Sequence, residues 1–380
     1  MAKFEQYIDV GKRRLRLGYS TGTCAAAAAG GAVRALLGGA FPEVFIVETP
    51  AGITVEAELS DCTLGDGFAS CAVRKDGGDD IDATDGMLIY ARVELSDDPG
   101  EVSIDGGEGI GRVTRPGLDQ PVGNAAINTV PREMIEREMR FAAGEYQYTG
   151  GMRVVISAPE GETVAKRTFN SRLGILGGVS ILGTTGIVRP MSEQALLDTI
   201  RVELSMLYAS GERRVVLYPG NYGKDFAVNE LKLRPELMIS CSNYLGEVID
   251  YAAVKGFESL LLVGNFGKLI KVAGGVMNTH SRIADGRREI MAAHTAMAGG
   301  RMPLVKRVYG CLSTDEALDI LAEAGILHKV MESLTGAFEE NLRHRAGESM
   351  RIEGLFFSNK HGILGKTDGA DELLTLDGND

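Results

Sequence analysis

The sequence predicts a mixed α/β and α+β protein, in which an N-terminal α+β domain (1–147) precedes a mostly parallel, Rossmann-like α/β domain (148–380). Two observations predict this division. Before the glycine-containing segment 144–151, short alternating runs typical of antiparallel strands accompany one alanine-rich stretch. After it, apolar strands, glycine loops and helical stretches follow one another, which is the pattern of a parallel sheet with crossover helices.

In the N-terminal domain we expect a hairpin, a further strand and two helices. Residues 45–49 and 53–59 fit the two strands of the hairpin, joined by a Pro-Ala-Gly turn, and residues 86–95 alternate in the same way. A helix is predicted over 131–143, because Pro131 suits its first turn. The alanine-rich stretch supplies the other helix.

In the C-terminal domain the predicted strands are 153–158, 214–218 and 259–263, and the predicted helices are 192–208 and 242–254. Ligands of parallel sheets bind at the carboxyl ends of the strands. We therefore expect this domain to hold the cofactor, at the glycine turns that follow the second and third of these strands.

Composition narrows the classes of function. The chain of 380 residues carries a formal net charge of −12 at pH 7, which argues against a general nucleic-acid binder, because phosphate binding requires concentrated Lys and Arg. No apolar run approaches the roughly 18 residues of a membrane span, and the basic start has no apolar signal core behind it. We expect a cytoplasmic protein that binds neither nucleic acid nor membrane.

The cysteines predict no metal site. All five are scattered along the chain, without a Cys-x-x-Cys pair or a nearby His at zinc spacing. We expect reduced thiols, most of them buried.

The most unusual segment is residues 18–30, where small hydroxyl residues lead into the alanine-rich helix. Thr21 or Thr23 is expected to cap this helix, while free backbone N–H groups and the helix dipole face an anion. The alternative is a capped helix whose alanines let another element approach closely. Both interpretations remain open from the residues alone.

A second segment, residues 183–192, is a glycine and threonine loop that places Thr184, Thr185 and Arg189 just before a helix. Loop amides, hydroxyls and a fixed cation suit an acidic group. An ordinary strand-to-helix turn with Arg189 on the surface is the alternative.

A third segment, residues 262–288, gathers Lys268, Lys271 and Arg282 in a chain that is acidic elsewhere. Long connections with clustered polar groups often carry function. His280 near Asp285 is a candidate acid–base pair, because imidazole titrates near neutrality and a carboxylate can orient it. A hydrogen-bonded structural histidine is the alternative.

Several familiar motifs are absent. The sequence has no Gly-x-x-x-x-Gly-Lys-Ser/Thr loop, no His-Glu-x-x-His, no Gly-x-Ser-x-Gly elbow and no strand followed by Gly-x-Gly-x-x-Gly. From the residues alone, the prediction stops at an α/β enzyme with loops suited to anions. Taken together, however, segment 18–27, loop 183–190 and the run 263–275 through His280 resemble the CbiD family, in order and spacing along nearly the whole chain.

The resemblance implies methyl transfer from S-adenosylmethionine to C-1 of cobalt-precorrin-5B, which gives cobalt-precorrin-6A in anaerobic cobalamin (vitamin B12) biosynthesis. Cobalt arrives only as part of this small-molecule tetrapyrrole, which carries several acetate and propionate carboxylates. A ring carbon attacks the sulfonium methyl group in line, so the enzyme mainly aligns two reactants and excludes water. The oligomeric state stays open, and a homo-oligomer is compatible with the sequence.

On this resemblance, each candidate residue receives a role. The expected substrate-binding residues are Thr21, Thr23, Thr184, Thr185, Arg189, Lys268, Lys271 and Arg282. The expected cofactor-binding residues are Gly220, Asn221, Gly264 and Asn265, and the expected catalytic pair is His280 with Asp285. The first domain is then expected to face the substrate and the second to bind S-adenosylmethionine.

Two alternatives to this function are retained. A small-molecule kinase would use the Gly/Ser/Thr segment for the phosphates of ATP. A noncatalytic corrinoid-binding protein would hold the tetrapyrrole without turnover.

Overall fold

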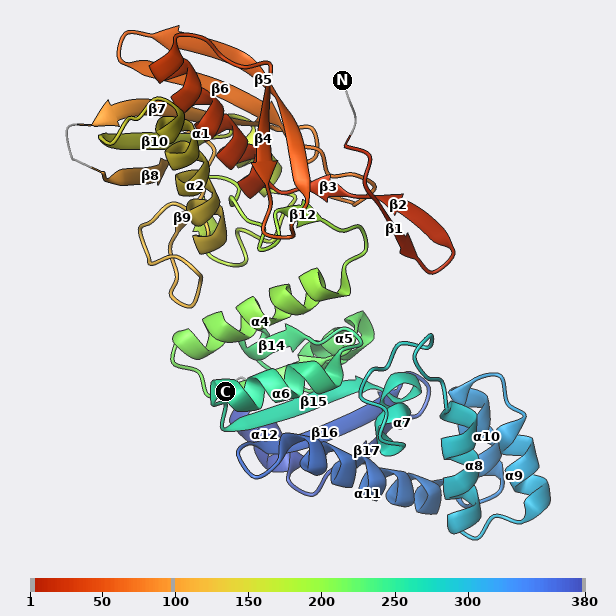
Figure 1. Ribbon diagram of the computed structural model, residues 1–380. Helices are drawn as coiled ribbons and strands as arrows, with labels where there is room; N and C mark the ends of the chain where they lie inside the picture. The colour runs from red at the N-terminus through yellow and green to blue at the C-terminus, as the bar shows by residue number, and fades with distance from the viewer. Residues whose placement is uncertain (1–3, 97–99, 378–380) are drawn as a thin grey trace. The chain divides into compact units, whose positions relative to one another are not determined.

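The computed structural model describes residues 4–96 and 100–377 (Figure 1). They form two compact units, which divide between Glu193 and Gln194 and are called here the N-terminal and the C-terminal unit. This division corrects the boundary expected between residues 147 and 148. The physical reason is strand pairing, because strand β10 (Gly151–Ser157) hydrogen-bonds to two strands of the N-terminal unit.

The N-terminal unit is built on a six-stranded sheet of order β4-β5-β6-β7-β10-β8, in which only β10 and β8 run parallel. Besides β10, its strands are β4 (Val44–Glu48), β5 (Thr54–Gly65), β6 (Phe68–Arg74), β7 (Leu88–Ser96) and β8 (Val102–Gly106). The predicted hairpin is confirmed by β4 and β5, and the predicted strand 86–95 by β7.

Three short strand pairs complete the described part of this unit, and the second and third of them join parts that are distant in sequence. They are β1 (Tyr7–Val10) with β2 (Arg13–Arg16), β3 (Gly18–Tyr19) with β12 (Ile187–Val188), and β9 (Arg112–Val113) with β11 (Ile175–Leu176). The pairing of β3 with β12 brings two of the candidate segments, 18–30 and 183–192, side by side. Their separation in sequence gave no sign of this contact.

Helix α1 (Thr21–Gly38) lies at the centre of the N-terminal unit, where it packs on α2 (Thr129–Glu145) and on strands β6 and β7 (Figure 1). The alanines at 25–29 are all 0% exposed. Small side chains permit this approach, since a Cβ at Gly30 would lie 2.3 Å from the ring of Phe45. Close approach of the alanine-rich helix to its neighbours is therefore confirmed. A short helix, α3 (Gly161–Ala165), follows β10.

The C-terminal unit contains a five-stranded mixed sheet of order β14-β13-β15-β16-β17. Its first four strands run parallel and β17 is antiparallel to β16. The strands are β13 (Arg214–Tyr218), β14 (Met238–Ser240), β15 (Ser259–Asn265), β16 (Arg351–Ser358) and β17 (Gly362–Lys366). The predicted strands 214–218 and 259–263 are confirmed by β13 and β15.

The helices of the C-terminal unit are α4 (Glu193–Ala209), α5 (Asn221–Asn229), α6 (Leu245–Lys255), α7 (Phe266–Ala273), α8 (Arg287–Met297), α9 (Met302–Tyr309), α10 (Thr314–Glu323), α11 (Leu327–Ala346) and α12 (Ala370–Asp377), with a 3₁₀ turn at Pro235–Leu237. Helix α4 confirms the prediction over 192–208. Helix α6 begins later than residue 242, where the backbone is left-handed with φ of 53°. No helix in the described part of the chain is both long and apolar enough to cross a membrane.

Both faces of this sheet are covered, as the central strand β15 shows. Leu260 and Leu262 belong to one hydrophobic cluster, whereas Leu261 and Val263 belong to another. Because side chains alternate between the two faces of a strand, a strand that is apolar throughout must be buried on both faces. The parallel sheet therefore has hydrophobic packing on both of its faces.

Candidate functional site

The carboxyl ends of β13 and β15 bring four of the predicted residues together. Gly220 and Asn221 follow β13 and begin α5, while Gly264 and Asn265 end β15. The two turns touch, since a Cβ at Gly223 would lie 3.5 Å from the Cα of Gly264. β13 has β14 on one side and β15 on the other, so this edge is the topological switch point of the sheet, where ligands of such folds bind.

These residues shape the edge in different ways. Gly220 has φ of 119° and ψ of 166°, a conformation open to glycine, and it caps α5 without a side chain. Asn265 is the N-cap of α7, and its Oδ1 accepts a hydrogen bond from the N–H of Gly267 at 2.9 Å. A Cβ at Gly264 would lie 3.0 Å from Pro219, so this glycine lets the two turns pack closely.

Lys268, on α7, is a half-buried cation beside this edge. Its Nζ donates a hydrogen bond to Oδ1 of Asn243 at 3.1 Å, and the hydroxyl of Thr279 donates to the same oxygen at 3.2 Å. Lys268 forms no ion pair with any carboxylate in residues 4–96 or 100–377. Burial lowers the pKa of Lys268 below its ordinary value, because the charged form loses water.

Lys271 does not offer its amine to a ligand, which corrects the prediction that it binds substrate. The side chain is 3% exposed, and its Nζ donates hydrogen bonds to the carbonyl oxygens of Thr279 at 3.0 Å and Ala284 at 2.9 Å. Burial lowers the pKa of Lys271, and the carboxylate of Asp285 opposes this in part. The amine holds the loop between α7 and α8.

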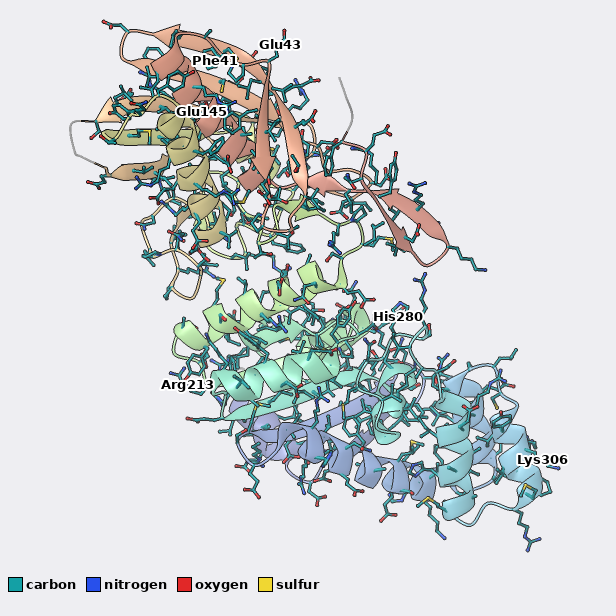
Figure 2. The ribbon with its side chains drawn as sticks, in the orientation of Figure 1. Phe41, Glu43, Glu145, Arg213, His280 and Lys306 are labelled. Carbon is teal, nitrogen blue, oxygen red and sulfur yellow. The ribbon has the colours of Figure 1, made fainter. Side chains whose placement is uncertain are left out.

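His280 and Asp285 do not form the predicted pair. Figure 2 shows His280 on the exposed loop between α7 and α8, where its Nδ1 accepts a hydrogen bond from the backbone N–H of Arg282 at 3.1 Å. Asp285 is bound by the guanidinium of Arg287, with Nη2 to Oδ2 at 2.9 Å, and this hydrogen-bonded ion pair lowers the pKa of Asp285. The guanidinium two residues away engages both oxygens of the carboxylate, so Asp285 is already paired.

Arg282 is the cation of the loop between α7 and α8. Its side chain is exposed, and its guanidinium makes no hydrogen bond or ion pair with another residue in the described part of the chain. Its predicted role in binding the substrate stays a prediction.

The start of α1 is closed by protein groups. Ser20, and neither predicted threonine, is the N-cap, and its Oγ accepts a hydrogen bond from the N–H of Thr23 at 3.2 Å. The N–H of Gly22 donates to the carbonyl of Leu182 at 3.1 Å. The amides of Gly22 and Thr23 are therefore not available to an anion, and the expectation that they face one is corrected.

Two buried threonine hydroxyls tie this helix to the loop at 180–186. Thr21 Oγ1 accepts from the N–H of Leu182 at 2.9 Å, and Thr23 Oγ1 donates to the carbonyl of Gly186 at 2.7 Å. Direct substrate contact was predicted for both. In the structure they position the loop, because their hydroxyls are buried and already hydrogen-bonded.

The outer side of the same loop is exposed at Thr184, Thr185 and Arg189. Thr185 Oγ1 donates to the carbonyl of Ile187 at 3.1 Å, which rigidifies the turn. Arg189 makes no ion pair with a residue that the structure describes. Thr184 and Arg189 thus present an uncommitted hydroxyl and cation to solvent.

A pocket of about 260 Å³ lies in the C-terminal unit between the starts of α8 and α10. It is lined by Asp285, Arg287, Arg288, Met291, Val308, Cys311, Leu312, Ser313, Thr314 and Ala317. Sequence reasoning missed this pocket, because two helices separate its two halves. Its signal in the sequence was Asp285 with the adjacent arginines, which all lie in the third candidate segment. No group of three or more His, Cys, Asp or Glu side chains in the described ranges is arranged to hold a metal ion.

Comparison with known proteins covers both units. The family model described as CbiD matches residues 8–190, and that described as CbiD, C-terminal domain, matches residues 278–368. A cobalt-precorrin-5B C(1)-methyltransferase of Ruminiclostridium cellulolyticum is 46% identical over 93% of this chain and 92% of its own. Another from Alkaliphilus metalliredigens is 42% identical over 98% and 97%. A crystal structure of a cobalamin biosynthesis protein (cbiD) from Archaeoglobus fulgidus is 31% identical over 74% of this chain and 87% of that one, with a TM-score of 0.40.

Proposed function

Because this chain belongs to the CbiD family, we propose that it is an enzyme that methylates C-1 of cobalt-precorrin-5B, yields cobalt-precorrin-6A and acts in cobalamin biosynthesis. The observation that carries this proposal is the similarity to a protein named for the reaction over 93% of the chain. That length includes both units, so the whole chain is assigned the reaction.

We place the methyl donor, S-adenosylmethionine, at the switch point of the C-terminal sheet. The residues there fit such a ligand, since the turn at Gly220 has no side chain and Lys268 brings a positive charge without an acidic partner in the described residues. When bound, the donor supplies an electrophilic methyl group on its sulfonium centre. The Rossmann-like interpretation of this unit belongs to the same proposal, because parallel strands present ligands at their carboxyl ends.

For the tetrapyrrole, we propose that exposed cations bind its carboxylates. Arg189 of the N-terminal unit fits this role, and Arg282 of the C-terminal unit is a separate candidate for it, because each guanidinium is exposed and makes no ion pair within the described ranges. Thr184 adds a hydroxyl donor beside Arg189. A guanidinium binds a carboxylate through two parallel hydrogen bonds, which fixes orientation as well as affinity.

The remaining candidates either hold a loop in place through hydrogen bonds to its backbone or donate a hydrogen bond to the substrate. Thr21 and Thr23 hold the loop of Arg189, while Lys271 holds the loop of His280. The Nδ1 of His280 accepts a hydrogen bond, which leaves Nε2 as the ring nitrogen that can donate. We therefore propose that His280 donates a hydrogen bond to the substrate, and we assign Asp285 no role in proton transfer.

Mass spectrometry of the product tests the reaction. The purified protein should convert cobalt-precorrin-5B, with S-adenosylmethionine, to a product heavier by one methyl group, together with S-adenosylhomocysteine. A tetrapyrrole that is bound but unchanged in mass would instead indicate a noncatalytic corrinoid-binding protein. Consumption of ATP without methylation would indicate a kinase. In a matched reaction without S-adenosylmethionine, the tetrapyrrole should keep its mass.

A further inference from the structure

The amine of Lys268 lies over the turn that begins α5. A Cβ at Gly220 would lie 3.6 Å from the Nζ, so the cation stands directly beside the N-cap of this helix. The polar neighbour of the Nζ is a neutral amide oxygen of Asn243. A half-buried charge with such a neighbour keeps most of its desolvation cost, and an anion beside it would offset that cost.

The first turn of α5 adds donors at the same place. The N-cap is a glycine, so no side chain covers the helix start, and the N–H groups of Asn221 and Tyr222 donate no hydrogen bond to any residue in the described part of the chain. Free amides and the helix dipole favour negative charge at this end of a helix. The amine of Lys268 and these two amides thus lie around one position that favours a bound anion.

We propose that Lys268 and the first amides of α5 bind the carboxylate of the methionine moiety of S-adenosylmethionine. This inference rests on the proposed function and changes the expectation that Lys268 binds the tetrapyrrole. The methyl donor carries a single carboxylate, whereas its sulfonium is positive and would be repelled by the amine. The lysine therefore fixes which end of the donor lies over α5, and the sulfonium points away from it.

Calorimetric titration with two ligands tests the contact. S-adenosylhomocysteine keeps the carboxylate, and 5′-methylthioadenosine lacks the whole aminocarboxyl group. Lys268→Met should weaken S-adenosylhomocysteine binding by about 10- to 100-fold, the range for one hydrogen bond to a charged group. It should leave 5′-methylthioadenosine binding within about twofold of the wild type, because that ligand has no carboxylate to lose. Lys306→Met is the matched control, since Lys306 is an exposed lysine of the same unit (Figure 2).

The carboxamide of S-adenosylhomocysteine gives a second measurement on the wild-type protein, which holds even where Lys268→Met does not fold. The wild type should bind the carboxamide more weakly than S-adenosylhomocysteine, by the same factor by which Lys268→Met weakens S-adenosylhomocysteine binding. Lys268→Met itself should bind the carboxamide and S-adenosylhomocysteine almost equally. Equal loss of both nucleosides in Lys268→Met, or unchanged binding of S-adenosylhomocysteine with weaker tetrapyrrole binding, would overturn the assignment. A wild-type protein that binds no adenosyl ligand would instead overturn the cofactor itself.

Discussion

The Nζ of Lys271 donates a hydrogen bond to the carbonyl oxygen of Thr279 at 3.0 Å, from a side chain that is 3% exposed. A second bond reaches Ala284 at 2.9 Å, so one buried amine fixes two points of the loop that carries His280. A neutral side chain of similar length would leave both carbonyls without this donor. The loop is therefore held by a buried cation whose amine already donates to two backbone carbonyls.

Lys271→Met should loosen this loop. We expect the free energy of unfolding to fall by about 1–3 kcal/mol, the cost of leaving buried hydrogen-bonding groups unpaired. Limited proteolysis with trypsin should then cut faster after Arg282 than in the wild type, while Lys306→Met should not change the rate. Unchanged cleavage together with lost tetrapyrrole binding would show that Lys271 contacts the substrate after all.

Asp82→Asn should destabilise the N-terminal unit in a pH-dependent way. Asp82 pairs at 2.7 Å with Lys75, which is 2% exposed. Burial alone raises the pKa of Asp82, but the charge and hydrogen bond of Lys75, together with hydrogen bonds from the side chain and backbone of Thr84, bring it below the ordinary value. A lowered folded-state pKa contributes stability that is present above the unfolded pKa and is lost as pH falls through the folded one.

At pH 7 we expect Asp82→Asn to cost about 3 kcal/mol, because it leaves the buried Lys75 unpaired. Urea unfolding should show the difference in stability between wild type and variant shrinking below about pH 4, where Asp82 takes up a proton in the unfolded wild type before it does so in the folded protein. Asp66→Asn, at an exposed position, should show no such gap. A gap that stays constant down to pH 3 would contradict the ion-pair explanation.

The main effect of Thr23→Val should be a lower free energy of unfolding, and not the loss of a direct contact with the tetrapyrrole. Valine keeps the volume but removes the donor to the carbonyl of Gly186, so we expect a loss of about 1–2 kcal/mol in chemical unfolding. The exposed Thr63→Val serves as the control. A variant of wild-type stability that no longer bound the tetrapyrrole would restore the original prediction of direct contact.

Arg189→Ala should weaken tetrapyrrole binding by about tenfold, as expected for loss of an exposed charge-assisted contact. Affinity for S-adenosylhomocysteine and the unfolding midpoint should stay near those of the wild type, because Arg189 is exposed and makes no ion pair within the described ranges. Arg13→Ala, another exposed arginine of the N-terminal unit, is the control. Equal loss of both ligands would contradict a substrate-specific role.

Local signals in the sequence determined several of the longer helices, several of the sheet strands and the positions of the polar loops. Strand β13 has the predicted bounds, and the turns at Gly220 and Gly264 were located because glycines follow apolar strands. These features depend on side-chain periodicity and backbone freedom over a few residues. Segment 18–27, loop 183–190 and the run 263–275 through His280, which includes the turn at Gly264, carried the family resemblance, and with it the reaction.

Only the tertiary structure decided which hydrogen-bonding and charged groups remain free to bind a ligand. β10 looked like the start of a new domain, yet it pairs with β7 and β8. The hydroxyl of Thr23 and the amine of Lys271 are taken by distant carbonyls, whereas Lys268, three residues before Lys271, faces the switch point without an acid within the described residues. Sequence shows which donors exist, but burial and long-range pairing decide which of them a ligand can still reach.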